Sequence, residues 1–272
     1  MGDEGWNNST LIPHTTFPLP YISPLIPHTA SLIPHTYHAN HHQKATFVLG
    51  NPYVTDGLVA HFDGIWNAGL GRHDPAATEW TNLVSGNHTI SSAAISFAPD
   101  ALNIQSSVIS INLNSDAAVK AISSGKFTIE IVGFIEAFTT TRFYWLADST
   151  DQYGSPNISL MTHNISAMFI LQKLSTIENV VSHGSDTAPC SAYGNIVVKQ
   201  DDNTQYKALF YKDARLNTYR WFEESTSPKN LFINSFATGP VGKYHALRIY
   251  SRPLSETEIT ANYEIDKIRF HL

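Results

Sequence analysis

The sequence predicts an all-β protein: a two-sheet antiparallel jelly-roll sandwich with one short C-terminal helix, preceded by an extended proline-repeat arm. Three observations carry this prediction. From residue 47 onward, short apolar or β-branched runs alternate with clusters of turn-forming residues. One segment near the C-terminus has a helix-capping pattern, and a proline recurs every seven residues near the N-terminus. We therefore divide the chain into an arm, residues 1–46, and a sandwich domain, residues 47–272.

The arm contains a seven-residue repeat. Leu-Ile-Pro-His-Thr occurs at 11–15, 25–29 and 32–36, and Pro-Leu-Pro-Tyr-Ile at 18–22 is a degraded copy in register. Proline in every repeat excludes a coiled coil, so the arm is expected to be extended, with a reach on the order of 85 Å over four repeats. The arm is apolar and nearly uncharged, which favours docking on another protein. The expected contacts are Pro13, His14, Pro20, Tyr21, Pro27, His28, Pro34 and His35.

Two other interpretations of the arm stay open. It holds six of the thirteen histidines, and three parallel chains could stack them in rings, with His41 and His42 binding a metal on the axis. Such a repeat arm would favour a homotrimer. The other interpretation is a passive linker or a cloning tag.

Strands are expected from runs rich in β-branched and aromatic residues. Within residues 127–137, alternation places the isoleucines on one face and the carboxylates of Glu130 and Glu136 on the other, which we expect to point outward. A hairpin turn is expected at residues 212–215. The expected strands cover residues 57–62, 107–113, 127–137, 143–147, 158–160, 167–173, 196–199, 205–211, 218–223 and 245–250.

The expected helix begins at a capping box. Ser255 and Glu258 have the spacing in which a hydroxyl at the N-cap and a carboxylate three residues later bond each other's backbone amides. We expect a short helix to about Tyr263, with Ile259 and Tyr263 forming its buried stripe.

Composition narrows the function classes. The chain is 42% hydrophobic and 15% charged with a net charge of −6, which suits a globular domain and argues against nucleic-acid binding. The single cysteine, Cys190, cannot form an internal disulfide. The N-terminus lacks the features of a cleaved export signal, and no stretch approaches the ~18 apolar residues of a membrane span. We therefore expect neither signal-dependent export nor membrane insertion.

Four segments carry a resemblance. They are Asp-Gly-Leu-Val-Ala-His-Phe-Asp-Gly at 56–64, Trp-Thr-Asn-Leu-Val-Ser-Gly-Asn at 80–87, Phe-Thr-Ile-Glu at 127–130 and Ala-Leu-Arg-Ile-Tyr-Ser-Arg-Pro-Leu-Ser-Glu-Thr-Glu-Ile at 246–259. In order and spacing, the chain over about residues 54–270 resembles laminin-G-like, concanavalin-A-like jelly-roll domains. The resemblance implies a two-sheet antiparallel sandwich of a kind used to bind sugars or proteins on cell surfaces and phage particles. We interpret Arg248 and Arg252, in the last segment, as structural.

Glycosidases share this fold, and retaining ones need two carboxylates about 5 to 5.5 Å apart. Glu130 and Glu136 would lie roughly 20 Å apart along one strand. We therefore expect no catalytic residues and no enzyme activity, with glycoside hydrolysis as the alternative.

Candidate ligand contacts come from loop residues. Aromatic side chains that could stack on a glycan are Trp66, Tyr153, Tyr193 and Trp221. Weak candidates for a Ca²⁺ site are Asp148 and Asp151, or the acidic pair at 201–202; ordinary turn chemistry is the preferred explanation for both pairs.

The preferred hypothesis combines these features. Laminin-G-like domains usually act outside the cell, and virion proteins assemble in the host cytoplasm and act extracellularly without a signal peptide. We expect a non-catalytic virion structural protein, a phage head fibre or decoration protein. Its arm would dock on a capsid or other virion protein, and its head would bind a glycan or the host surface. The alternatives are a glycoside hydrolase on the same fold and a bacterial surface adhesin.

Overall fold

The computed structural model describes residues 51–104, 109–137, 143–148, 159–162, 190–200, 206–222, 228–235 and 241–272. The chain divides into two units, Met1–Phe47 and Val48–Leu272. All of the arm contacts predicted from the repeat lie outside the described residues.

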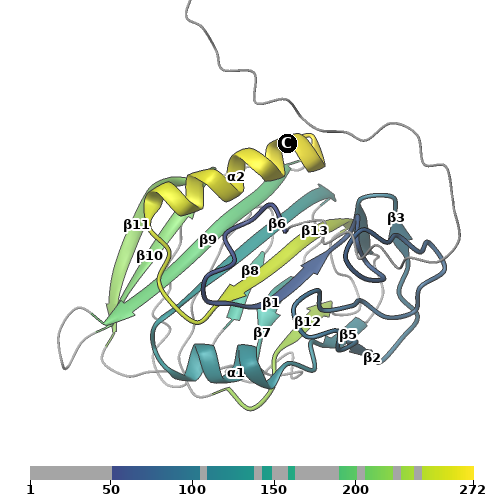
Figure 1. Cartoon of the computed structure of the whole chain (residues 1–272), viewed down its shortest axis with the longest axis horizontal. Coiled ribbons are helices and arrows are strands. Elements are labelled where there is room, and N and C mark those ends of the chain that lie inside the picture. The colour runs from purple at the N-terminus through teal and green to yellow at the C-terminus, as the bar shows by residue number, and fades with distance from the viewer. Residues whose placement is uncertain are drawn as a thin grey trace, which may run out of the picture. The chain divides into compact units, whose positions relative to one another are not determined.

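The described part of the second unit is an antiparallel β-sandwich with two helices, which confirms the predicted fold class (Figure 1). One sheet has the strand order β11-β10-β9-β6-β13-β4-β3, with β1 also paired to β13, and the other has the order β2-β5-β12-β7-β8. The larger sheet contains β1 (Leu58–Asp63), β3 (Phe97–Ala98), β4 (Ala101–Ile104), β6 (Phe127–Ala137), β9 (Cys190–Gln200), β10 (Tyr206–Lys212), β11 (Arg215–Phe222) and β13 (Val241–Tyr250). The smaller sheet contains β2 (Ile90–Ser91), β5 (Ile109–Asn112), β7 (Phe143–Ala147), β8 (Ser159–Thr162) and β12 (Phe232–Ser235).

The main hydrophobic core contains side chains from both sheets. Trp145 of β7 is fully buried, and its ring meets the edge of Tyr244 of β13 with ring centroids 4.9 Å apart. The hydroxyl of Tyr244 donates to the carbonyl oxygen of Trp145 at 3.1 Å. A Cβ at Gly133 of β6 would lie 2.3 Å from the indole of Trp145. The indole therefore packs directly on the backbone of β6, where there is no room for a side chain.

The long strands lie where the sequence predicts them. β6 and β7 have the predicted bounds, and β9, β11 and β13 extend beyond their predicted cores. Four strands of two to four residues, β2, β3, β4 and β12, are not predicted from the sequence, because so short a run shows no clear alternation of apolar and polar residues. The strand expected at 167–173 lies outside the described residues. The predicted hairpin turn is confirmed: it joins β10 and β11 through Asp213 and Ala214, both with positive φ.

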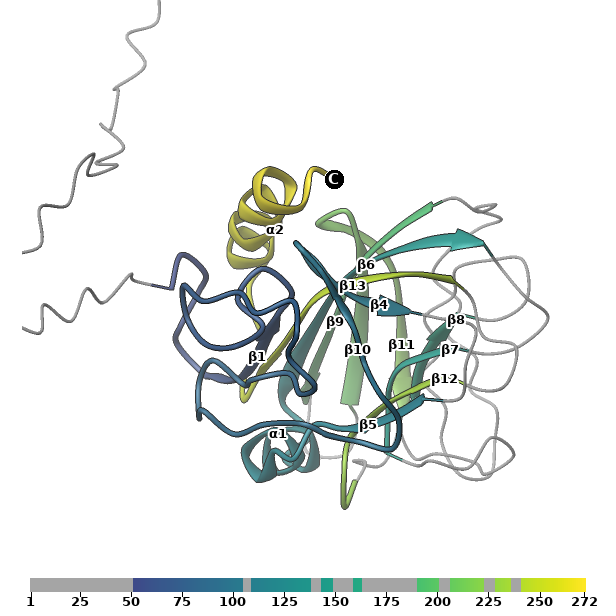
Figure 2. The same cartoon turned by 90° about the vertical axis from the view of Figure 1, so that its right-hand side faces the viewer.

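Helix α2 (Glu256–Phe270) lies across the outer face of the larger sheet, and the smaller sheet lies on the opposite face (Figures 1 and 2). The predicted capping box between Ser255 and Glu258 is present. The helix ends at Phe270 rather than near Tyr263. Its buried residues are Ile259, Asn262, Asp266 and Phe270, and the two polar residues among them interrupt the apolar periodicity that predicts a helix.

Helix α1 (Asp116–Ser123) has no counterpart in the prediction. Ser115 caps it by accepting a hydrogen bond from the backbone amide of Ala118. Its buried residues, Ala118, Ala121 and Ile122, join the main core. Two turns with three small or medium apolar residues give too weak a pattern to be recognised in the sequence.

Candidate functional site

A buried polar network lies between the larger sheet and α2. Arg248 of β13 is fully buried, and its Nε donates to Glu130 Oε2 of β6 at 2.7 Å. Its Nη1 donates to Asp266 Oδ1 of α2 at 3.1 Å, and its Nη2 donates to Asp266 Oδ2. Two residues beyond the end of the same strand, Arg252 pairs with Glu258 at 2.6 Å. Both arginines are therefore bound to the helix, which agrees with the structural role expected for them.

Glu130 lies on the outer face of the sheet, as the alternation predicts. The side chain is nevertheless fully buried, because α2 covers that face. Its Oε2 also accepts from Asn262 Nδ2 at 2.9 Å and from the hydroxyl of Tyr250 at 3.3 Å. Burial raises the pKa of Glu130, and the charge of Arg248 opposes this shift. Glu136, beyond the helix, is exposed as predicted.

A third arginine joins the end of α2 to strand β1. Arg269 binds both carboxylate oxygens of Asp63, at 2.7 Å and 3.1 Å, and donates to the hydroxyl of Tyr53 at 2.7 Å. Burial opposes ionisation of Asp63, but the nearby imidazole of His61 and the guanidinium of Arg269 outweigh it and lower the pKa of Asp63 to about 2. Burial lowers the pKa of His61, which favours its neutral form.

The predicted glycan contacts lie in different parts of the chain, and the prediction that they bind a glycan stays untested. Trp66 is half-buried, and the guanidinium of Arg269 lies 4.0 Å from its ring centroid, so one face of the indole already has a cationic partner. Tyr193 lies in β9 opposite Val132, and Trp221 lies in β11 opposite Lys207. Tyr153 lies outside the described residues.

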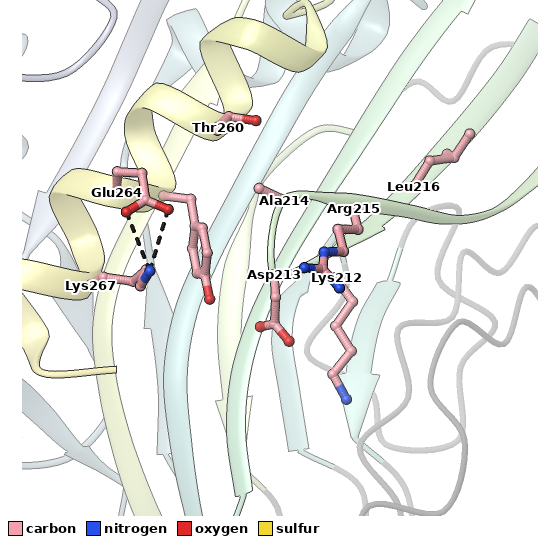
Figure 3. A pocket seen from close by; sticks show the side chains of 9 residues that line it. Lys212, Asp213, Ala214, Arg215, Leu216, Thr260, Glu264 and Lys267 are labelled. Atoms are coloured by element: carbon pink, nitrogen blue, oxygen red, sulfur yellow. Dashed lines mark hydrogen bonds and ion pairs between the residues drawn. The ribbon is translucent and has the colours of Figure 1, made fainter. Parts of the chain in front are cut away.

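A groove lies between the β10–β11 hairpin and α2 (Figure 3). Its volume is about 680 Å³, which is within the usual range for pockets that bind small molecules. The hairpin contributes basic and acidic side chains, and the helix contributes a tyrosine, a threonine and an ion pair between Glu264 and Lys267 at 3.3 Å. The lining residues are Lys212, Asp213, Ala214, Arg215, Leu216, Thr260, Tyr263, Glu264 and Lys267.

Tyr263 is the aromatic residue of this groove. Burial, together with the negative charge of Asp213, raises its pKa, so the phenol keeps its proton. The sequence prediction placed Tyr263 in the buried stripe of the helix. It is half-buried, and it packs beside Phe270 while also lining the groove.

A smaller hollow of about 390 Å³ lies among loop residues 68–88. There His88 Nδ1 lies 3.2 Å from the hydroxyl of Thr81 and 3.7 Å from a carboxylate oxygen of Glu79. Most of the residues that line this hollow are exposed, and none of the residues predicted to bind a ligand lines it.

The described residues contain no group of three or more histidine, cysteine, aspartate or glutamate side chains placed to hold a metal. Of the Ca²⁺ candidates, Asp148 follows β7 and has an interaction partner, whereas Asp151 and the pair at 201–202 lie outside the described residues. Within the described ranges, no helix is long and apolar enough to cross a membrane.

The groove joins two parts of the chain that no local sequence pattern connects. The sequence predicts a turn at 212–215 and a helix that contains Tyr263, but nothing in it pairs the two. One signal was present: the turn itself carries three charged residues, Lys212, Asp213 and Arg215.

No family model and no curated protein matches the chain. Solved structures do match its fold. Trypanosoma rangeli sialidase in complex with sialic acid aligns with a TM-score of 0.54 at 12% identity, over 78% of this chain and 33% of the sialidase. Domain 4 of AbnA, a GH43 extracellular arabinanase from Geobacillus stearothermophilus, in complex with arabinotriose, aligns with a TM-score of 0.52 at 15% identity, over 75% of this chain and 96% of that domain.

A third similar structure is the binding domain of botulinum neurotoxin DC in complex with rat synaptotagmin II, with a TM-score of 0.54 and 10% identity over 77% of this chain and 51% of that chain. This chain spans about a third of the length of the sialidase chains. At these identities the likeness shows the fold: a β-sandwich also found in glycosidase-type proteins and in binding domains.

Proposed function

We propose that this protein is a non-catalytic virion structural protein, a phage head fibre or decoration protein, whose β-sandwich head binds carbohydrate at the host surface. The observation that carries the carbohydrate part is the alignment with AbnA domain 4. The alignment covers 96% of that domain, which is described in complex with arabinotriose. The similarity therefore extends over nearly the whole of that domain.

The use of the buried acidic side chains supports a non-catalytic role. Glu130 and Asp266 are bound to Arg248, and Asp63 is bound to Arg269, in a network beneath α2. A glycosidase needs its acid and its nucleophile or base facing the sugar. These three carboxylates instead fasten the helix to the sheet.

The arm supports anchoring to a particle. Its repeats place a proline at 13, 20, 27 and 34, within a segment whose charged residues are Asp3, Glu4 and Lys44. Extended proline-rich segments lose little conformational entropy on docking and present side chains at fixed intervals. Such a segment suits a repetitive protein surface such as a capsid.

The carbohydrate part is tested with the full chain on a glycan array, together with an assay for newly formed reducing ends. We expect retention of at least one glycan class without release of reducing ends. Release of reducing ends would establish the glycoside hydrolase alternative. Failure to retain any glycan would remove the carbohydrate part of the proposal.

The anchoring part is tested with a full-length variant in which the Leu-Ile pairs at 11–12, 25–26 and 32–33 are replaced by serine. Both proteins are offered to intact phage particles and to isolated capsomers, and bound protein is quantified by co-sedimentation and located by cryo-EM. We expect the original chain to decorate particles and the variant to stay in solution. Equal binding of the two, or binding of neither, would contradict an anchoring arm.

A further inference from the structure

We propose that residues 51–54 form a mechanical strap, which fastens the start of the sandwich domain to helix α2 so that tension on the arm is carried by the helix before it reaches strand β1. These are the first described residues after the arm. The inference goes beyond the proposed function, and it holds whatever partner the arm binds. Three features support it: the contacts of Tyr53, the spacing of its partners on α2 and the order of the chain.

Tyr53 is the centre of the strap. Its side chain is only 3% exposed, although it lies so near the start of the domain. Its hydroxyl donates to Asp266 Oδ1 at 2.7 Å and accepts from Arg269 Nη1 at 2.7 Å. Burial raises the pKa of Tyr53, so the hydroxyl keeps the proton that it donates. Both partners are charged, and hydrogen bonds to charged groups are stronger than those between neutral ones.

The backbone of the strap and the ring of Tyr53 add further contacts. The amide of Val54 donates to Asn262 Oδ1 at 3.0 Å, and the amide of Tyr53 donates to Asn51 Oδ1 at 3.2 Å, which closes a turn just before the ring. The guanidinium carbon of Arg248 lies 4.0 Å from the ring centroid of Tyr53. The ring therefore covers the cation that links β13 to α2, and the strap is part of the buried network.

The partners of the strap are spaced along one face of α2. Asn262, Asp266 and Arg269 follow one another at intervals of four and three residues, which places them on successive turns of the same face. Asp266 also accepts from Arg248, and Arg269 also donates to Asp63, so these helix residues are themselves held on the sheet. A pull on the strap is therefore shared by several charge-assisted contacts along the helix.

The order of the chain puts the strap between the arm and the core. After residue 54 the chain turns and enters β1, where Ala60 and Phe62 join the main hydrophobic core. β1 pairs with the second half of β13 (Figure 1). Tension on the arm must pass Tyr53 before it reaches β1. While the strap holds, the force ends at α2 on the outer face of the sheet, and β1 is not pulled from β13.

Tyr53→Phe is the variant that tests the strap. Phenylalanine keeps the ring beside Arg248 but lacks the hydroxyl and both of its hydrogen bonds. The change leaves no charge without a partner, because Arg269 keeps its pair with Asp63 and Asp266 keeps its pair with Arg248. Any loss therefore belongs to the strap and not to an orphaned buried ion.

The first measurement stretches the full chain between its two ends at constant force with optical tweezers. The two ends then pull on opposite sides of the contact between Tyr53 and α2. Opening of the strap should release residues 51–57, an extension of roughly 25 Å, before the sandwich unfolds. We expect this opening to be about tenfold faster, or more, in Tyr53→Phe than in the original chain.

The second measurement is native-state hydrogen exchange, which reports the same opening without force. The amide of Val54 is bonded to Asn262, so it exchanges when the strap lifts from the helix. We expect its exchange to be about tenfold faster, or more, in Tyr53→Phe. The backbone amides of β13, in the middle of the larger sheet, should change less.

The matched control is Tyr244→Phe. Tyr244 is also buried, and its hydroxyl donates to the carbonyl oxygen of Trp145 within the main core. This variant makes the same chemical change away from the strap. It should lower the stability of the whole domain without speeding the opening of the strap. Circular dichroism establishes that both variants remain folded.

Two outcomes would overturn the strap. One is an opening rate under force, or an exchange rate of Val54, that Tyr53→Phe leaves unchanged. The other is an equal acceleration in Tyr53→Phe and Tyr244→Phe, because the strap would then open only together with the whole domain. Neither outcome bears on the proposed function, which the glycan and particle-binding experiments test separately.

Discussion

Glu130 of β6 and Arg248 of β13 are cross-strand partners, and their side chains meet at 2.7 Å beneath α2 with neither exposed to solvent. The guanidinium continues to Asp266 on the helix, so one buried cation links two strands and a helix. Burying charges is costly, and such a group stabilises a fold only while every partner is present. The network therefore fixes where α2 sits on the sheet.

Replacing Arg248 by methionine should be strongly destabilising. Methionine fills much of the volume but leaves Glu130 and Asp266 as buried carboxylates without a cation, and breaking such a pair costs about 3 to 5 kcal/mol. The free energy of unfolding from denaturant titration measures this. Arg252→Met is the control, because its ion pair with Glu258 is partly solvated and is expected to contribute about 1 kcal/mol or less. A similar loss of unfolding free energy in the two variants would contradict the role of Arg248 as the buried link between Glu130 and Asp266.

Acid should weaken the fold through Asp63. Its folded pKa of about 2 lies below the value of an unfolded aspartate, so its ionised form stabilises the protein above about pH 4. This contribution, about 2 kcal/mol, is lost as pH falls from 4 towards 2. The free energy of unfolding of the original chain and of Asp63→Asn is measured between pH 7 and pH 2. The difference between the two proteins should narrow as the pH falls from 4 towards 2. A constant difference would show that Asp63 does not titrate in this way.

Gly133→Ala should destabilise the sandwich core. The added Cβ would lie 2.3 Å from the indole of Trp145, so the ring or the strand must move, and overpacking of this kind typically costs about 1 to 3 kcal/mol. Gly86→Ala provides the comparison, because no atom lies within 4 Å of its Cβ position and the change carries only the backbone cost of positive φ. Thermal unfolding should rank Gly133→Ala as the less stable variant, and the reverse order would contradict the close packing of Trp145 on β6.

Ala214→Gly should stabilise the protein by about 0.5 to 1 kcal/mol, because glycine adopts positive φ without the strain that alanine carries there. Ala76→Gly is the matched control: Ala76 is exposed and does not have positive φ, so the change should be slightly destabilising. Chemical denaturation of both variants measures the difference. Stabilisation by both changes, or by neither, would contradict the strain assigned to Ala214.

The candidate site is harder to predict from the sequence than the fold is. The charged turn and the helix that carries Tyr263 were both found, yet they are about fifty residues apart, and no local pattern shows that a hairpin tip and a helix face each other across a groove. Trp66 is a predicted glycan contact because a loop tryptophan can stack on a sugar. In the folded protein its ring has Arg269 as a partner, a contact between residues far apart in the chain.

The sequence by itself determined the fold class, the long strands β6 and β7, the hairpin turn and the capping box of α2, because alternation, turn chemistry and capping are properties of neighbouring residues. The tertiary structure decided which face of β6 is solvated and where α2 ends. Alternation correctly places Glu130 on the outer face of β6, but α2 covers that face, and the predicted end of the helix near Tyr263 is wrong. Both features have one physical reason: Asn262 and Asp266 stand in place of apolar residues on the buried helix face, and they bond to Glu130 and Arg248 on the sheet.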